Sequence, residues 1–153
     1  NIAQCLIETG GDGWHVVSAE TGSTGELSSM LCDYLLAMTV DDYMGIERPF
    51  LHPDPRKRNP ETFARLWEMV GRIKQIAEDF VDADHILEIT RAEALAQVGL
   101  AGIPIRKTTK AEQAAYLGVM RLRTGCTILQ TTHDADALAV AMAALAKVRE
   151  KEA

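Results

Sequence analysis

Three side chains far apart in the sequence have types and spacing suited to binding a divalent cation. His133 and Asp136 lie three residues apart at the start of an alanine-rich segment, so they share one face if that segment is a helix. Glu47 ends the apolar-leaning run 40–46. Imidazole nitrogen and carboxylate oxygen are ligands that suit Mg²⁺ or Mn²⁺. We therefore predict a metal site built from Glu47, His133 and Asp136, provided that the fold brings them together.

A second interpretation of these acids stays open at this point. Acidic side chains are common in the first turn of a helix, because they complement the positive end of its macrodipole. Asp134 points away from the face that His133 and Asp136 share, so it is interpreted as a helix cap or an outer-shell acid. The remaining histidines have no neighbours at ligand spacing and are interpreted as structural: His15, His52 and His85.

Cysteine usage and length narrow the class of protein. Cys5, Cys32 and Cys126 are far apart, odd in number and without Cys-x-x-Cys spacing, which argues against zinc and is typical of reduced thiols in a cytoplasmic protein. The 153 residues suffice for one domain, residues 1–153, with a core of its own. No apolar run approaches the roughly 20 residues that a membrane span needs.

Positive charge is concentrated in two segments, although the net charge is −6. Residues 1–47 contain eight acidic residues and no lysine or arginine. The first basic group is Arg48, Arg56, Lys57 and Arg58, and the second is Arg106, Lys107, Lys110, Arg121 and Arg123. A polyanion responds to such local fields rather than to net charge, so both segments are candidates for contacts with nucleic acid. Ordinary solvated loops and helix faces are the alternative interpretation.

The elements that must position these residues follow from hydrophobic periodicity and turn signals. Residues 2–20 are predicted to form a hairpin around a turn at 10–13, and 40–47 and 85–89 to form strands. Helical spacing predicts helices over 26–38, 60–80, 110–122 and 134–151, with a short one after Thr90. Helix starts are marked by Asn59-Pro60 and by two capping boxes, Thr90–Glu93 and Thr109–Glu112. Alternating strands and helices imply an α/β fold with a mixed sheet covered by helices, in which sites collect at strand ends.

Four segments in a fixed order resemble a known family. They are Gly45-Ile46-Glu47-Arg48-Pro49-Phe50, the long helix after it, the helix start Thr109-Lys110-Ala111-Glu112-Gln113, and the closing His133-x-x-Asp136-Ala137-Leu138-Ala139. Over residues 1–148 the chain looks like the RuvC-type Holliday junction resolvases. The resemblance implies a ribonuclease H-like fold and a Mg²⁺- or Mn²⁺-dependent endonuclease that resolves four-way or branched DNA.

The resemblance also implies roles for individual residues. Glu47, His133 and Asp136 match the second, third and fourth metal-site positions of the family, where two cations would serve phosphodiester hydrolysis. Lys110 matches a basic residue near the scissile phosphate, and Phe50 matches an aromatic residue that stacks at the junction crossover. The expected DNA contacts are Arg48, Phe50, Arg56, Lys57, Arg58, Arg106, Lys107 and Lys110. Helix 60–80 matches the helix through which the family forms homodimers, and a two-fold dimer suits the two-fold symmetry of a four-way junction.

The chain departs from the family at the first acid. The family places that acid in an Asp-Pro-Gly turn after the first, central strand, and no Asp-Pro-Gly occurs here; Asp54-Pro55 lies in the loop after the second acid, in the wrong place. We expect residues 2–8 to be the second strand, with the first strand upstream of Asn1 and missing from this chain. The alternative is that Leu6–Gly10 is a degenerate first motif with Glu8 as its acid.

A second departure concerns the short helix after Thr90. The family usually has a lysine there, and this chain has Ala94, Leu95 and Ala96. Both departures leave two further functions open. One is a junction-binding protein of the same fold that does not cleave DNA, and the other is a different ribonuclease H-like nuclease, since fold alone does not fix the substrate.

Overall fold

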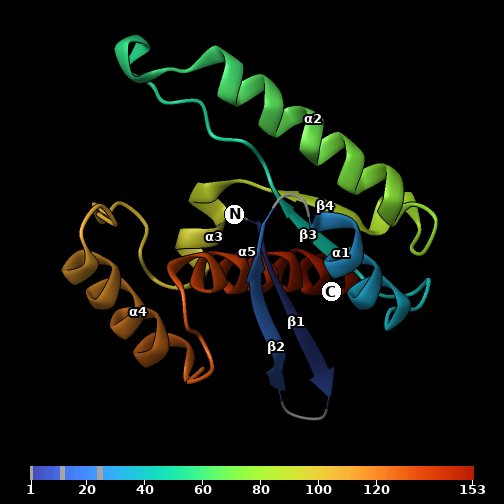
Figure 1. Cartoon of the computed structure of the whole chain (residues 1–153). Coiled ribbons are helices and arrows are strands. Elements are labelled where there is room, and N and C mark those ends of the chain that lie inside the picture. Colours follow the sequence, from blue (N-terminus) through green and yellow to red (C-terminus); the bar gives the residue numbers. More distant parts are fainter. Residues whose placement is uncertain (1, 11–12, 24–25) are drawn as a thin grey trace.

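Residues 2–10, 13–23 and 26–153 are described by the structure, a computed structural model, and they form the mixed α/β fold that the sequence predicts (Figure 1). The strands are β1 (Ile2–Gly10), β2 (Gly13–Gly22), β3 (Met44–Glu47) and β4 (Ile86–Ile89). The α-helices are α1 (Leu27–Leu36), α2 (Pro60–Ala77), α3 (Arg91–Gln97), α4 (Lys110–Thr124) and α5 (Thr132–Glu152). Residues 11–12 of the predicted turn, and the strand expected upstream of Asn1, lie outside the described residues.

The hairpin of β1 and β2 is antiparallel, as predicted, and carries a bulge that the sequence reading did not include. The register shifts between Leu6 and Ile7, because β2 has one more residue than β1 at that point. As a result Val16 and Ala19, three residues apart, both pack against the core. Val17 between them is 45% exposed. The bulge therefore turns the apolar side chains of β2 toward the interior along most of its length.

The described strands form two separate two-stranded sheets rather than the single mixed sheet that was expected. β1 pairs with β2, and β3 pairs with β4 in parallel, from Met44 opposite Ile86 to Glu47 opposite Ile89. Helix α5 joins the two sheets, since it packs against all four described strands. Figure 1 shows this helix, in red, crossing behind the β1–β2 hairpin, with β3 and β4 above it in the view.

β3 is shorter than the predicted strand 40–47 because a turn occupies the residues before it. The N–H and Oγ1 of Thr39 donate to Asp42 Oδ2 at 2.6 and 3.1 Å, and the N–H of Asp42 donates to the Thr39 carbonyl at 3.1 Å. These side-chain bonds hold the backbone in a turn rather than in a ladder. The strand begins only at Met44, and it places Glu47 at its carboxyl end.

The β3–β4 sheet separates two hydrophobic clusters. One face packs on α1 and α2 through Ile46 and Ile86, and the other packs on α5 through Leu87 and Ile89. Gly45 lies against α5 so closely that an added Cβ would be 2.8 Å from Ala144 Cβ. Successive strand residues face opposite sides. Gly45 and Glu47 therefore share the α5 side of the sheet.

Helix α2 begins where the sequence predicts and ends three residues early. Asn59 Oδ1 accepts the N–H of Thr62 at 3.0 Å, with proline at the first helical position. At the other end the N–H groups of Phe80 and Val81 both donate to the Ala77 carbonyl, at 2.9 and 3.0 Å, which closes the helix at Ala77 rather than Phe80. In the described part of the chain, no helix is both long enough and apolar enough to cross a membrane.

Candidate metal centre

Glu47 and Asp136, which are 89 positions apart, line one small cavity of about 10 Å³. Glu47 comes from the carboxyl end of β3, and Asp136 comes from the second turn of α5. The rest of the lining is contributed by α3 and α5: Arg91, Ala94, Leu95, Ala139 and Val140. The volume suffices for about one water molecule, and therefore for a small cation.

Small side chains bring the two acids together. Ala139, Ala143 and Ala144 of α5 are buried, and Gly45 has no side chain of its own, so the strand lies directly against the helix. Because Glu47 is two residues beyond Gly45, its side chain emerges on the same face as the helix contact. In the sequence Gly45-x-Glu47, the glycine therefore allows the strand to pack closely on α5, and the glutamate places a carboxylate on the same face.

Both carboxylate oxygens of Asp136 have donors from outside α5. The hydroxyl of Tyr116 donates to Oδ1 at 2.8 Å, and the ammonium of Lys107 donates to Oδ2 at 2.5 Å. The Lys107 Nζ also lies 4.6 Å from the centre of the Tyr116 ring. Burial, followed by the charge of Asp136 and the hydrogen bond to it, raises the pKa of Tyr116 above its usual range, so this hydroxyl remains a donor.

Glu47 lines the cavity and is exposed to solvent, yet its surroundings make its carboxyl group harder to ionise. Partial desolvation and then the nearby carboxylate of Asp136 raise the pKa of Glu47, whereas Arg91 and Lys107 act in the opposite direction. Two acids therefore face two cationic side chains. Their oxygens have the chemistry that Mg²⁺ and Mn²⁺ require, and one of those oxygens is already bonded to an ammonium.

His133 is exposed in the first turn of α5 and does not line the cavity. Within the described residues, the three-residue group whose ligand atoms all lie within 4.8 Å of one another is a different one, treated below. Glu47, His133 and Asp136 do not form such a group in this arrangement of side chains. A ligand role for His133 stays a prediction.

Asp134 has the capping role that was one of its two interpretations. Its Oδ2 accepts the N–H groups of Thr131 and Gln130 at 2.8 and 3.1 Å, which completes a capping box with Thr131. Its Oδ1 accepts the Thr21 hydroxyl of β2 at 2.5 Å, so the same carboxylate ties the hairpin to α5. Burial alone would raise the pKa of Asp134, but these hydrogen bonds outweigh it and lower the pKa.

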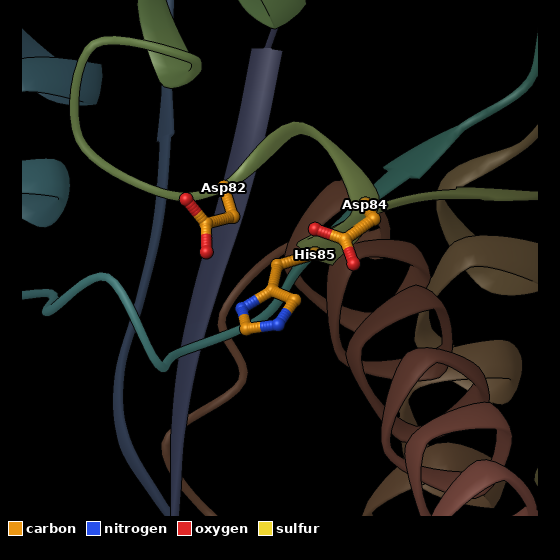
Figure 2. A group of neighbouring side chains, drawn as sticks. All are labelled: Asp82, Asp84 and His85. Atoms are coloured by element: carbon orange, nitrogen blue, oxygen red, sulfur yellow. The ribbon is translucent and has the colours of Figure 1, made fainter.

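A second cluster of possible ligands involves His85, which the sequence reading treated as having no ligand-spaced neighbours. That reading was wrong, because the ligand atoms of Asp82, Asp84 and His85 all lie within 4.8 Å of one another. Figure 2 shows the His85 ring between the two aspartates, in the turn before β4. The ring stacks on Tyr43 at 4.1 Å, and its Nδ1 is 3.2 Å from the Asp42 carbonyl. In the sequence, the spacing Asp-x-Asp-His of residues 82–85 indicates this cluster.

This cluster lies at the opposite end of the parallel sheet from Glu47. Residues 82–85 precede β4, whereas Glu47 ends β3, and the two strands run in the same direction. Both aspartates are exposed. Sites in open α/β sheets lie at the carboxyl ends of the strands, which favours the cavity of Glu47 and Asp136 as the candidate centre.

The predicted DNA-contact residues lie in different surroundings. Phe50 is 57% exposed, and Arg48 lies over the Trp67 ring at 5.6 Å. Arg58 donates to two carbonyls of its own loop, and Arg56 pairs with Asp54 at 3.1 Å. Lys57, Arg106 and Lys110 are exposed, whereas Lys107 points to Asp136 instead of to the surface. Figure 1 shows the loop after β3 and helix α4 on either side of α3.

Glu8, the alternative first acid, lies on the hairpin surface. Its side chain is 63% exposed and 3.5 Å from His15 of the neighbouring strand. It does not line the cavity of Glu47 and Asp136. The geometry therefore gives the Glu8 alternative no support.

Comparison with known proteins identifies the class of fold. The chain is similar to the solved structure of Thermus thermophilus RuvC, with a TM-score of 0.52 over 95% of this chain and 87% of that one, at 16% sequence identity. No family model matches the sequence, and no curated protein matches it. The fold is therefore RuvC-like, that is, ribonuclease H-like, and at this identity the similarity concerns the fold alone.

Proposed function

We propose that the protein is a metal-dependent endonuclease that cuts four-way or branched DNA junctions as a homodimer. The observation that carries the proposal is the meeting of Glu47 and Asp136 at one cavity, at the carboxyl end of a strand, in a ribonuclease H-like fold. Both residues were predicted as metal ligands from sequence. Their partners in the chain supply positive charge beside them, which a site for a phosphate group needs.

In this proposal, acidic residues bind the metal ion and basic and aromatic residues bind the DNA. Glu47 and Asp136 would hold Mg²⁺ or Mn²⁺, with His133 as a further ligand from the exposed first turn of α5. Such a cation supplies activation of water and stabilisation of the departing oxygen in phosphodiester hydrolysis. The basic groups, with Lys110 nearest to the site in the resemblance, would neutralise the DNA backbone, and exposed Phe50 would stack on a base at the crossover.

The dimer would form through the exposed part of α2. Its C-terminal half is covered by the cluster of Ile46, Val70 and Ala77, but Leu66 near its start is 38% exposed. Phe63 packs edge-on against Trp67 at 6.2 Å beside it. This apolar patch is at the end of α2 that follows the loop with Phe50, so a dimer there would bring two such loops together.

The test is cleavage of a synthetic four-way junction by the full chain in Mg²⁺ or Mn²⁺, with duplex DNA of the same arms as competitor. Cleavage of the junction is expected, and Glu47→Gln should reduce it to background. Glu88→Gln is the matched control, because it removes an acid from the opposite face of the neighbouring strand. Activity that survives unchanged in Glu47→Gln would remove the assignment.

One observation favours a second function, a protein that binds junctions without cutting them. The ammonium of Lys107 donates to Asp136 Oδ2 at 2.5 Å, which reduces the capacity of the site for two cations. Selective junction binding in gel shifts, with no cleavage in either Mg²⁺ or Mn²⁺, would select this function over the first.

A further inference from the structure

Lys107 is a charged side chain that approaches the acid pair of the candidate metal centre from a separate element. It lies in the segment before α4, with 20% of its side chain exposed, and Asp136 has 27% exposed. Its Nζ is 2.5 Å from Asp136 Oδ2 and 4.6 Å from the centre of the Tyr116 ring. Tyr116 holds the other oxygen of the same carboxylate. The ammonium is therefore located by two groups, a carboxylate and an aromatic face.

The charge balance explains why the ammonium is there. Glu47 and Asp136 line one cavity and repel one another when both are ionised. The carboxylate of Asp136 is partly buried, so it is costly without a counter-charge. Arg91 of α3 lines the same cavity, and Lys107 supplies positive charge by direct contact with Asp136.

We propose that Lys107 acts as an internal cation that competes with a divalent metal ion for Asp136. The inference rests on the metal centre of the proposed function and goes beyond it, because it makes metal binding dependent on a side chain that must leave. An ammonium and a metal cation on the same carboxylate oxygen repel one another, and most strongly in a partly buried site, so each weakens the binding of the other.

The release of Lys107 requires motion of its side chain more than of its backbone. The carbonyl of Lys107 accepts the Gln113 side-chain N–H at 3.0 Å, and the N–H of Thr108 donates to Glu112 at 2.9 Å. Both bonds fasten the backbone to the first turn of α4. When a cation takes Asp136 Oδ2, the ammonium therefore swings away from the Tyr116 ring and becomes accessible to solvent.

The first test measures Mn²⁺ affinity on the full chain by the electron paramagnetic resonance signal of free Mn²⁺. Lys107→Met keeps most of the length of the side chain and removes the competing charge, so it should bind Mn²⁺ several-fold more tightly than the wild type. Lys74→Met is the matched control, because Lys74 is also a half-buried lysine in an ion pair, with Glu88 at 2.8 Å, on the far face of the β3–β4 sheet. Its affinity should equal that of the wild type.

The second test measures the position of the ammonium directly. Labelling of Lys107 by acetic anhydride, read by mass spectrometry, should be slow in chelator and several-fold faster in saturating Mn²⁺, while labelling of Lys74 stays constant.

Equal or weaker Mn²⁺ binding by Lys107→Met would overturn the competition and leave the metal centre standing. Absence of Mn²⁺ binding by both proteins would overturn the metal centre and the competition together. Glu47→Gln in the Lys107→Met background should abolish the gain in affinity, and a gain that persists would also overturn the proposal.

Discussion

Charge at single residues determines what the candidate centre can bind. Glu47 carries a carboxylate that its surroundings make harder to ionise, and Asp136 carries one that two donors hold in place. The difference matters because a ligand must be deprotonated and oriented before a cation arrives. Asp134, one residue from His133, has its oxygens committed to a cap and to the hairpin, so it is not available as a ligand in this arrangement.

Replacement of Glu47 by glutamine should make the protein more stable at neutral pH. A carboxyl group whose pKa is raised on folding binds protons more readily in the folded state, so its stabilising contribution falls as pH rises through the folded pKa. Glu47→Gln removes that cost, and its advantage should shrink as pH falls through the folded pKa and vanish below the unfolded pKa, where the wild-type carboxyl is protonated in both states. Urea unfolding from pH 8 to pH 4 measures it, and a variant less stable than the wild type at pH 8 would contradict this explanation.

Replacement of Asp134 by alanine should destabilise the protein by about 2 kcal/mol at pH 7, since a cap and a buried hydrogen bond to Thr21 are lost together. Because the folded pKa of Asp134 is lowered, its contribution is complete above the unfolded pKa and is lost as pH falls through the folded value. Glu112→Ala is the control, because it removes the same capping box from α4 at an exposed site and should cost about 1 kcal/mol or less. Equal losses in the two variants would show that burial adds nothing.

At the scale of elements, the close approach of β3 to α5 creates the cavity. Gly45→Ala should destabilise the protein by about 1–3 kcal/mol, since the new Cβ would lie 2.8 Å from Ala144 Cβ and must displace the strand or the helix. Gly118→Ala in α4 is the control, because an added Cβ there meets nothing within 4 Å and should stabilise the helix by about 1 kcal/mol. Thermal unfolding followed by circular dichroism measures both, and a neutral Gly45→Ala would mean that this contact is loose.

Local sequence signals predicted the elements well. The caps at Asn59, Thr90 and Thr109 each act through the residue three positions away, so each could be predicted from a short stretch and each is confirmed. The alternation of Gly45 and Glu47 likewise follows from the period of a strand. The shortened β3 was missed because the bond from Thr39 to Asp42 competes with the ladder, and periodicity does not record such a bond.

Contacts between distant residues could not be predicted in the same way. Lys107 and Asp136 are 29 positions apart, and nothing in the spacing of either indicates the other. Lys107 was therefore read as a surface residue of a basic segment, whereas its ammonium lies against the acid pair. Residue type suggested Glu47 and Asp136 as partners only if the fold brought them together, and the family resemblance supplied that long-range geometry; the structure places both at one cavity.

For the molecule as a whole, the fold is ribonuclease H-like with its described strands in two small sheets that α5 connects. The proposed dimer adds a two-fold relation between two such domains. Leu66→Glu should weaken it at least tenfold, because a charge would enter an apolar contact at the exposed start of α2. Sedimentation velocity across a concentration series measures the change. Val119→Glu, at a similarly exposed apolar position of α4, is the control and should leave association unchanged, and a wild-type chain that is monomeric throughout would contradict the dimer.

The claim on which the account depends is that Glu47 and Asp136 hold a divalent cation between β3 and α5. Anomalous diffraction from crystals of the full chain soaked in Mn²⁺ tests it most directly. The account predicts a manganese peak within about 2.5 Å of carboxylate oxygens from both residues, with Lys107 displaced from Asp136. A peak confined to the cluster of Asp82, Asp84 and His85, with none beside Glu47, would contradict it.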